Sequence, residues 1–495
     1  MNKPLRILSI QSIHAFVGAM LAVLCLLAGM ANLVRFATKH ATGIGLADAM
    51  TMFSYALLMV SMIWWCRSVA PLRNERRIVA IILTGSLLLK LGLVFSLGHI
   101  LQTGDRLFLS QFIDRWVDGN SAALRDLSWE YYDYPLWFGR AWPFLYPLRL
   151  WMSESFIIAS QILNAFISTL LCAFVYLFVR PYVRRPLIPL VLAVLSTTYT
   201  WQVVEYGYLF QGGIFLLAGM YVLNHIRLRH TSKYTRLVWP VILQSLIYFL
   251  LFLQQGLELV LVAVSFAFSV YSWFASRSVR SFVLMLIFSV LLPVAISYPA
   301  MRTVKQYYKH HDEGQLSSHF IGHMAMGWNM VTWGEYYGPV VALDRRTPLD
   351  QKNRVMMDYL VDKIRSRPFD ALVKLPIIKV IKLFQVGAAS GAEENLFAAG
   401  NMHWLGVAKS TRIVFAPFLL FFAAIGSVRF FSRNGEHVFS WALLVLAFVF
   451  AYTFFSETSP RYSFFFMFVL IACATEGIDY TVSFFNQPQR ARTIK

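Results

Sequence analysis

Charged side chains are scarce in this chain. Of its 495 residues, 14% are Asp, Glu, Lys or Arg, whereas 58% are hydrophobic. A soluble domain of this length needs far more charged surface, so the composition excludes an ordinary soluble enzyme and predicts a polytopic membrane protein. Negative charge is the scarcer sign, with 25 acidic against 44 basic residues and a formal net charge of +19.

Cysteine and nucleotide-binding motifs are also scarce or missing. The four cysteines lie in or at the edge of apolar runs, at Cys25, Cys66, Cys172 and Cys473. They predict neither a disulfide framework nor a C-x-x-C metal site. The sequence has no G-x-x-x-x-G-K-[ST] and no strand-borne G-x-G-x-x-G, so no nucleotide site is indicated. It also has no internal repeat, which counts against the inverted-repeat plan of many transporters.

Long apolar runs dominate what is present. Runs of roughly 18 or more apolar residues predict about 12 transmembrane helices, because a helix of that length spans the hydrocarbon layer. They centre on 13–35, 46–66, 77–99, 155–179, 186–204, 207–226, 237–254, 257–275, 281–301, 411–431, 437–455 and 462–484. Backbone amides must be satisfied within the chain in lipid, so the predicted fold class is an all-α polytopic membrane protein.

Basic residues indicate the orientation of this bundle. They gather in every second connection, for example in 66–77, 179–185 and 225–236. The positive-inside rule therefore predicts that both termini are cytoplasmic. The first apolar run is too long for a signal-peptide core, so we expect it to remain as a helix. A nucleic-acid partner is not expected, because the basic residues are dispersed among loops and form no single face.

Two connections on the predicted outer face are long. Two N-terminal helices (1–76) precede a core (77–301) that contains the first outer loop, 104–154. The second outer loop covers 302–410, and C-terminal helices occupy 411–495. All other connections are short turns. Chemistry on the outer face is therefore expected to use these two loops.

The first outer loop opens with acidic residues and continues with aromatic ones. It begins GDRLFLSQFIDRWVDGN, in which Asp105, Asp114 and Asp118 follow directly on an apolar run. Spacing puts Phe108, Phe112, Trp116 and Leu124 on one face, which predicts a juxtamembrane helix in the interface plane. The stretch SWEYYDYPLWFGRAWPFLYPLRLWM is typical of an aromatic belt, and its arginines and prolines also fit a surface over a cavity.

The second outer loop contains a further predicted helix. From Pro348 the pattern places Val355, Tyr359, Leu360 and Ile364 on one face, with a stop at Pro368. Lys374, Lys379 and Lys382 then interrupt an apolar stretch. Two interpretations of these lysines stay open: they either snorkel to anionic headgroups or hold the phosphate of a lipid.

The order of several short motifs resembles the GT-C class of integral-membrane glycosyltransferases. The similarity is to the bacterial relatives of protein O-mannosyltransferases and of the lipid A aminoarabinose transferase. It is carried, in order, by Gly104-Asp105, FLYP (144–147), QILN (161–164), Glu205 in QVVEYGYLFQ, HMAMGWN…GEYYGP and ETSPRYSFFF (457–466). The two helices before residue 77 are extra, and Arg106 stands where the family often has a second acid.

The resemblance implies a GT-C-like fold and transfer of a sugar in the cell envelope. The donor would be a polyprenyl-phosphate-linked sugar, and the acceptor an envelope glycan, lipid or protein on the outer face of a bacterial cytoplasmic (inner) membrane. Asp105 is the expected catalytic base, with a helix cap as its structural alternative. Glu205 is expected to line the site, because a carboxylate at that depth is costly unless it is paired or functional. Asp114 and Asp118 are expected on the solvated side of their helix.

Cations and aromatic residues complete the expected site. Arginine forms directed hydrogen bonds to phosphate, and lysine supplies a point charge. The expected ligands of the donor phosphate are Arg302, Lys305, Lys379, Lys382 and Arg461. Tyr134, Arg140 and Tyr146 are expected at the acceptor cavity. No cofactor is required, although His310, His311, His319 and His323 leave a divalent metal as an alternative.

Two alternative functions remain open at this stage. An O-antigen ligase or polymerase also has about a dozen spans and a large late outer loop, but it does not require an acidic first loop. A lipid-linked sugar flippase or transporter predicts charged residues within the spans along a pathway. Few such residues occur, among them Lys90, Gln244 and Glu258. Two interpretations of Lys90 stay open: it either snorkels or serves the transferase fold.

Overall fold

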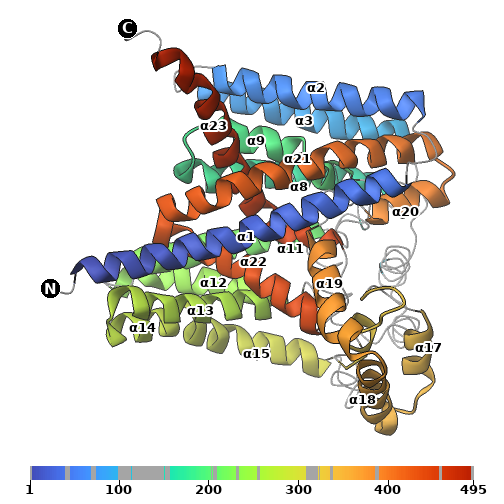
Figure 1. Ribbon diagram of the computed structural model, residues 1–495. Helices are drawn as coiled ribbons and strands as arrows, with labels where there is room; N and C mark the ends of the chain where they lie inside the picture. The colour runs from blue at the N-terminus through green and yellow to red at the C-terminus, as the bar shows by residue number, and fades with distance from the viewer. Residues whose placement is uncertain are drawn as a thin grey trace.

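The structure is a bundle of helices. This computed structural model describes residues 3–39, 45–68, 74–97, 113, 150, 156–201, 203, 209–229, 234–253, 257–307, 321–322, 324–334, 338–384, 390–455 and 460–491. All regular elements within these ranges are helices, which confirms the all-α class. Most of them run side by side, with both chain termini at one end of the bundle and α17 to α20 near the other (Figure 1).

The helices follow the apolar runs, and η denotes 3-10 or π-helical turns. The N-terminal part forms α1 (Lys3–Lys39), α2 (Leu46–Ser68) and α3 (Glu75–Leu97). The middle part forms α8 (Phe156–Val179), η1 (Arg180–Tyr182), α9 (Leu187–Val194), α10 (Thr197–Trp201), α11 (Leu209–Arg229), η3 (Tyr234–Leu237), α12 (Val238–Phe252), α13 (Leu257–Ser276), α14 (Val279–Leu286), η4 (Ile287–Leu291) and α15 (Leu292–Tyr307).

The remaining helices belong to the second long connection and the C-terminal part. The connection contains α17 (Gly338–Arg346), α18 (Leu349–Ser366), η6 (Asp370–Lys374), α19 (Leu375–Leu383) and α20 (Ser390–Ala398). The C-terminal part forms α21 (Met402–Asn434), η7 (Gly435–His437), α22 (Phe439–Phe450), η8 (Ala451–Phe455), η9 (Pro460–Phe466) and α23 (Met467–Ala491). Helix α18 matches the helix predicted between Pro348 and Pro368, which is thereby confirmed.

Several helices have the length and composition of membrane spans. Among the described residues, eight helices are long and apolar enough to cross a bilayer. Gly212–Leu228, Val238–Phe252 and Phe439–Phe455 are apolar but shorter. A membrane protein is therefore confirmed, while the number of 12 spans stays a prediction. Several helices are longer than the predicted spans: α1 covers Lys3–Lys39, one helical run continues to Tyr307, and α21 already begins at Met402.

The predicted span 186–204 is not one continuous helix. Helix α9 ends at Val194 and α10 begins at Thr197. The break frees carbonyls at membrane depth, and side chains satisfy them. Tyr55 of α2 donates to Leu195 O, and Thr200 Oγ1 lies 3.4 Å from Val194 O. A break in lipid is tolerated only with such partners.

Helix α21 is the centre of the bundle, where it packs closely against α1 and α23. At Gly426 of α21, a Cβ atom would lie 1.9 Å from Cys473 O of α23. At Gly477 of α23, a Cβ atom would lie 2.0 Å from Phe422 O. At Gly18 of α1, it would lie 2.7 Å from Val428 Cα. Only glycine therefore permits these backbones to approach each other so closely.

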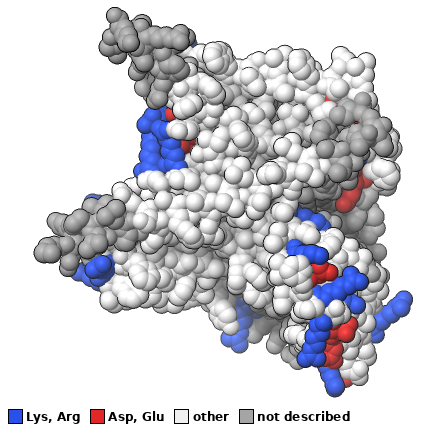
Figure 2. Space-filling view, viewed as in Figure 1, with Lys and Arg blue, Asp and Glu red and all other residues white. Residues whose placement is uncertain are grey.

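A buried carboxylate joins α21 to α23 near the end of the bundle that holds the termini. Glu476 is 1% exposed, and its oxygens lie 2.8 Å from Arg429 Nε and 3.3 Å from Arg433 Nη1. A carboxylate at this depth requires such pairing. Figure 2 shows charged side chains at this end and around α17 and α18, with a broad uncharged face between them. This distribution is typical of a bundle embedded in lipid.

Other arginine–carboxylate pairs join helix ends in the same way. They connect residues that are far apart in the sequence: Arg180 with Glu75, Arg185 with Asp479, and Arg227 with Glu436. Tyr176 adds a hydrogen bond of 2.5 Å to Glu75. These contacts fix the ends of α3, α8, α11 and α23 relative to one another.

We expect Gly426→Ala to destabilise the bundle strongly. The new methyl group would overlap Cys473 O, so α21 and α23 would have to separate, at a free-energy cost of about 1–3 kcal/mol or more. Gly92→Ala in α3 is the matched control, since nothing lies within 4 Å of a Cβ atom there. It should leave stability equal or raise it by about 0.5–1 kcal/mol. Thermal unfolding in detergent measures both, and equal midpoints would contradict the close crossing.

Candidate functional site

The expected acids of the site lie outside the described part of the chain. This holds for Asp105 and Glu205, and equally for Asp114 and Asp118. It also holds for Tyr134, Arg140 and Tyr146 at the expected acceptor cavity. Their roles therefore stay predictions. What the structure describes is the end of the bundle to which these residues connect, namely α17 to α20, η8, η9 and the adjacent ends of α15 and α21.

The structure brings two of the expected phosphate-binding segments together. Helix α19 carries Lys379 and Lys382, and it packs against η9, the segment that contains Arg461. Phe384, directly after α19, has its ring 5.3 Å from that of Phe466 in η9. About 80 residues of sequence separate the two segments, so a sequence pattern alone does not indicate that they touch.

The expected cations differ in their surroundings. Arg302 in α15 is exposed. Lys305 lies in α15 and Arg461 in η9, but the side chains of both lie outside the described part. Lys379 is 1% exposed, so its stem is fully packed. Lys382 directs two of its three N–H groups to backbone carbonyls, with Nζ 2.7 Å from Thr332 O and 3.3 Å from Trp333 O.

The partner of these two lysines is a tight turn, Trp328–Gly334, in the second outer connection. Asn329 organises the turn: its carbonyl accepts from Gly334 N at 2.9 Å, and its side chain accepts from Val331 N at 2.8 Å. Asn329 Nδ2 also lies 3.2 Å from Thr332 Oγ1. A Cβ atom at Gly334 would lie 2.8 Å from Lys379 Cδ, so the lysine stem packs directly on this glycine.

The turn also joins the outer segment to the bundle. Trp328 Nε1 donates to Phe454 O at 2.9 Å, a carbonyl at the end of η8. This satisfies an acceptor that a helix end leaves without an intrahelical partner. The turn was not predicted as part of the site from the sequence. Asn329 and Gly334 could have indicated a turn at this position, because their residue types favour turns.

Helices α17 and α18 pack on the helical segment just before this turn. A small core of Ala325, Met326, Val340 and Met356 lies between them. Lys352 Nζ lies 3.2 Å from Asp344 Oδ2 beside it. At the other side of this end, Arg412 of α21 pairs with Glu393 of α20. Asp344 and Glu393 are therefore each paired with a cation, which makes them poor candidates for a general base.

Helix α10, the last described helix before Glu205 in the sequence, ends beside α21. Its last residue, Trp201, donates from Nε1 to Thr411 Oγ1 at 3.2 Å. The ring of Trp201 also lies 6.2 Å from that of Trp404. Since Thr411 is adjacent to Arg412, α10 ends near the Arg412–Glu393 pair.

Lys90 lies inside the bundle. It is fully buried in α3, and its Nζ lies 3.8 Å from Cys172 Sγ of α8, a weak acceptor. No carboxylate is paired with it among the described residues. The four cysteines are buried and free, which confirms their interpretation as small apolar residues.

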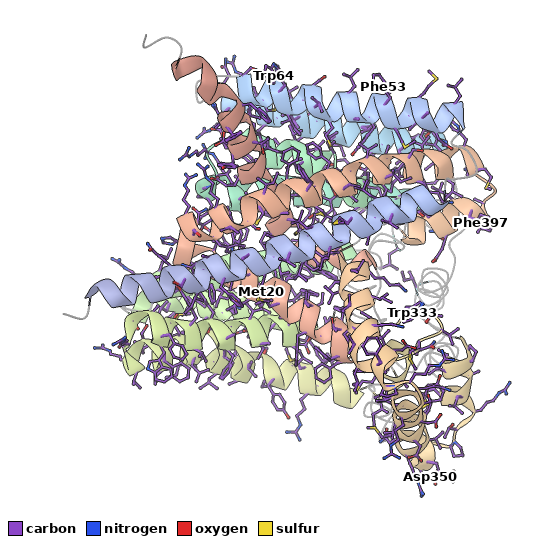
Figure 3. The ribbon with its side chains drawn as sticks, in the orientation of Figure 1. Met20, Phe53, Trp64, Trp333, Asp350 and Phe397 are labelled. Atoms are coloured by element: carbon purple, nitrogen blue, oxygen red, sulfur yellow. The ribbon has the colours of Figure 1, made fainter. Side chains whose placement is uncertain are left out.

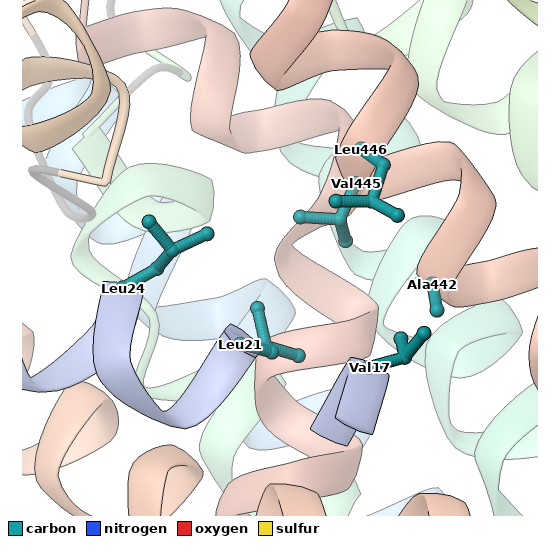
Figure 4. A pocket seen from close by; sticks show the side chains of 6 residues that line it. All are labelled: Val17, Leu21, Leu24, Ala442, Val445 and Leu446. Carbon is teal, nitrogen blue, oxygen red and sulfur yellow. The ribbon is translucent and has the colours of Figure 1, made fainter. Parts of the chain in front are cut away.

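Other features are unsuited to chemistry. Figure 4 shows a recess between α1 and α22 that is lined only by apolar side chains: Val17, Leu21, Leu24, Ala442, Val445 and Leu446. Within the described ranges, no cluster of three or more potential metal ligands occurs. The histidines that raised a metal as an alternative, His310, His311, His319 and His323, lie outside these ranges.

We expect Gly334→Ala to disrupt the outer turn. Gly334 has φ of +82°, and a methyl group there would meet Lys379 Cδ and Gly327 O within 3.0 Å. The unfavourable φ of the alanine and the overlap of its methyl group together destabilise the turn by about 1–3 kcal/mol. Limited proteolysis within 321–340 and the thermal midpoint report the change. Gly338→Ala is the matched control, because a Cβ atom there has open space around it. Equal protease sensitivity of both variants would contradict this packing.

We expect Lys90→Met to stabilise the protein. Burial of an amine with only a thiol partner is unfavourable in lipid, and methionine has a similar length without that penalty. The expected gain is about 1–3 kcal/mol, visible as a higher thermal midpoint in detergent. Lys374→Met, which replaces a half-exposed lysine paired with Asp370, serves as the control and should not stabilise. A lower midpoint for Lys90→Met would show that the amine supports the fold.

Comparison with known proteins adds no relative. No protein-family model matches the chain, and neither a curated protein nor a solved structure matches it. The resemblance to GT-C glycosyltransferases is therefore carried by the quoted motifs alone. At the end of the bundle that holds α17 to α20, cations and aromatic side chains lie next to the apolar helices.

Proposed function

We propose that the protein is a membrane glycosyltransferase with a GT-C-like architecture. It transfers a sugar from a polyprenyl-phosphate carrier to an envelope glycan, lipid or protein acceptor. The reaction takes place on the outer face of a bacterial cytoplasmic membrane. The acceptor hydroxyl oxygen attacks the anomeric carbon, the bond from that carbon to the phosphate oxygen breaks, and polyprenyl phosphate leaves. A carboxylate takes the proton of the hydroxyl group.

The observation that carries this proposal is the contact between α19 and η9. It joins Lys379 and Lys382 to the segment of Arg461 at the end of an apolar bundle. A lipid-linked phosphate has to be held where a cationic surface meets the membrane, since its polyprenyl chain stays in lipid. The exposed Arg302 near the end of α15 adds a further cation.

Two carboxylates of this end, Asp344 and Glu393, are poor candidates for the base, because each is paired with a cation. In the proposed mechanism Asp105 takes the proton of the acceptor, and Glu205 orients the acceptor or the base. Tyr134, Arg140 and Tyr146 line the acceptor cavity. Partial loss of hydration at the membrane surface raises the pKa of such a carboxyl group toward the working pH.

We expect Asp105→Asn to abolish the transfer in cells. A missing general base lowers the rate by about 10²–10⁴-fold, so the variant should resemble the deletion strain. Mass spectrometry of polyprenyl-phosphate sugars and envelope glycans measures this. One decoration should be lost while one polyprenyl-phosphate sugar accumulates. Asp114→Asn, expected on the solvated side of its helix, is the matched control and should retain the decoration.

Membrane expression of each variant has to be equal for this comparison. A wild-type profile for Asp105→Asn, together with a phenotype of the deletion, would assign Asp105 a structural role. A deletion that changes the length of a glycan without accumulation of a monosaccharide carrier would favour an O-antigen ligase or polymerase. Accumulation of the carrier on the inner leaflet alone would favour a flippase.

A further inference from the structure

Trp333 adopts a backbone conformation that is unfavourable for a tryptophan. Its φ is +55°, in the left-handed region, and the adjacent Gly334 has φ of +82°. For a bulky residue this conformation costs about 1–2 kcal/mol, whereas glycine or asparagine adopts it more easily. In the described part of the chain, Arg277 also has a positive φ, but it follows directly on α13, where helix ends often take this conformation. Trp333 follows no such helix end.

The surrounding residues hold Trp333 in this conformation from two sides. Asn329 closes the turn below it through Gly334 N and Val331 N. Lys382 holds the carbonyls of Thr332 and Trp333 itself, at 2.7 and 3.3 Å from its Nζ atom. The stem of Lys379 fills the space next to Gly334, so the turn cannot relax in that direction. The turn itself and helix α19 therefore maintain one strained residue.

The tryptophan side chain is not needed for any of these contacts. The hydrogen bonds described above for Asn329 and Lys382 use backbone atoms or the side chains of Asn329, Thr332 and Lys382, and none uses the indole of Trp333. A glycine at position 333 would form the same turn with less strain. Strained residues of this kind occur at binding sites, where the strain positions a side chain for a ligand.

Trp333 lies at the end of the bundle where the proposed reaction takes place. Figure 3 shows it beside α19, the helix that also carries Lys379 and Lys382. The residue is partly exposed, whereas Asn329 beneath it is 2% exposed. An indole ring on a rigid support presents a flat apolar face, on which the C–H groups of one face of a sugar ring can pack. The segment of Arg461 packs against the same helix, α19.

We infer that Trp333 binds the sugar ring of the polyprenyl-phosphate-linked donor. Lys382, Lys379 and Asn329 are positioning residues that hold the ring in place. The two lysines hold the turn and also belong to the cationic surface of the proposed phosphate site. This inference depends on the proposed function, because it names the donor of that same reaction.

The test uses the full chain in nanodiscs and measures binding by native mass spectrometry. The probes are bare polyprenyl phosphate and the same carrier linked to glucose, mannose or 4-amino-arabinose. Wild-type protein should bind one glycosylated carrier more tightly than the bare carrier. Trp333→Gly should reduce this preference about tenfold, since an aromatic packing contact contributes about 1.4 kcal/mol. Its thermal midpoint should be equal to wild type or higher.

Two further variants test whether the preference depends on the ring at position 333. Trp333→Phe should keep part of the preference, and Trp64→Ala, which removes an exposed indole from α2, should keep all of it. A Trp333→Gly variant that keeps the preference contradicts the inference and leaves the proposed function intact. A lower midpoint of this variant would make Trp333 a packing residue and also overturn the inference. Wild-type protein that prefers no glycosylated carrier contradicts the proposed function itself.

Discussion

The close approach of α21 to α1 and α23 determines how the rest of the molecule is arranged. Lipid tails are as apolar as leucine, so helices in a bilayer associate through close packing and not through exclusion of water. Gly18, Gly426 and Gly477 remove the side chains that would keep the three backbones apart. Because α21 runs from Met402 to Asn434, it also connects the α20 contacts at one end of the bundle with the Glu476 pairs at the other. Any change of its crossing angles would move both ends.

Side chains from distant parts of the sequence satisfy the backbone where helices end or break. Tyr55 donates to Leu195 O at the α9–α10 break, Trp328 donates to Phe454 O at the end of η8, and Lys382 holds the carbonyls of the outer turn. Water is not available to the carbonyls of the α9–α10 break at membrane depth, so that break needs a dedicated donor. The outer turn and the core are therefore parts of one hydrogen-bonded framework. The geometry proposed for the donor site depends on that framework.

Sequence patterns predicted the features that depend on local composition. The all-α class, the helix of α18 and the free cysteines follow from apolar runs, helical spacing and the lack of cysteine pairs. The break at Ser196 was not predicted, because hydropathy does not separate a broken apolar run from a continuous one. The engagement of Lys382 by the turn was not predicted either. The position of Lys382 in an apolar stretch indicates a cation near the membrane, but its partner Thr332 lies 50 residues away in the sequence. The expected acids Asp105 and Glu205 stay predictions.

The arginine–carboxylate pairs have a consequence for the order in which the chain inserts into the membrane and folds. Arg180, Arg227, Arg429 and Arg433 lie in connections or helix ends whose positive charge predicts the orientation of the bundle. In the folded protein the same residues are paired with Glu75, Glu436 and Glu476. Their charge is available to orient the helices only before these partners meet, when each span enters the membrane with its neighbours still absent. On the predicted orientation, the same arginines thus act twice. They first orient the helices during insertion, and they then form the ion pairs that connect helices in the folded bundle.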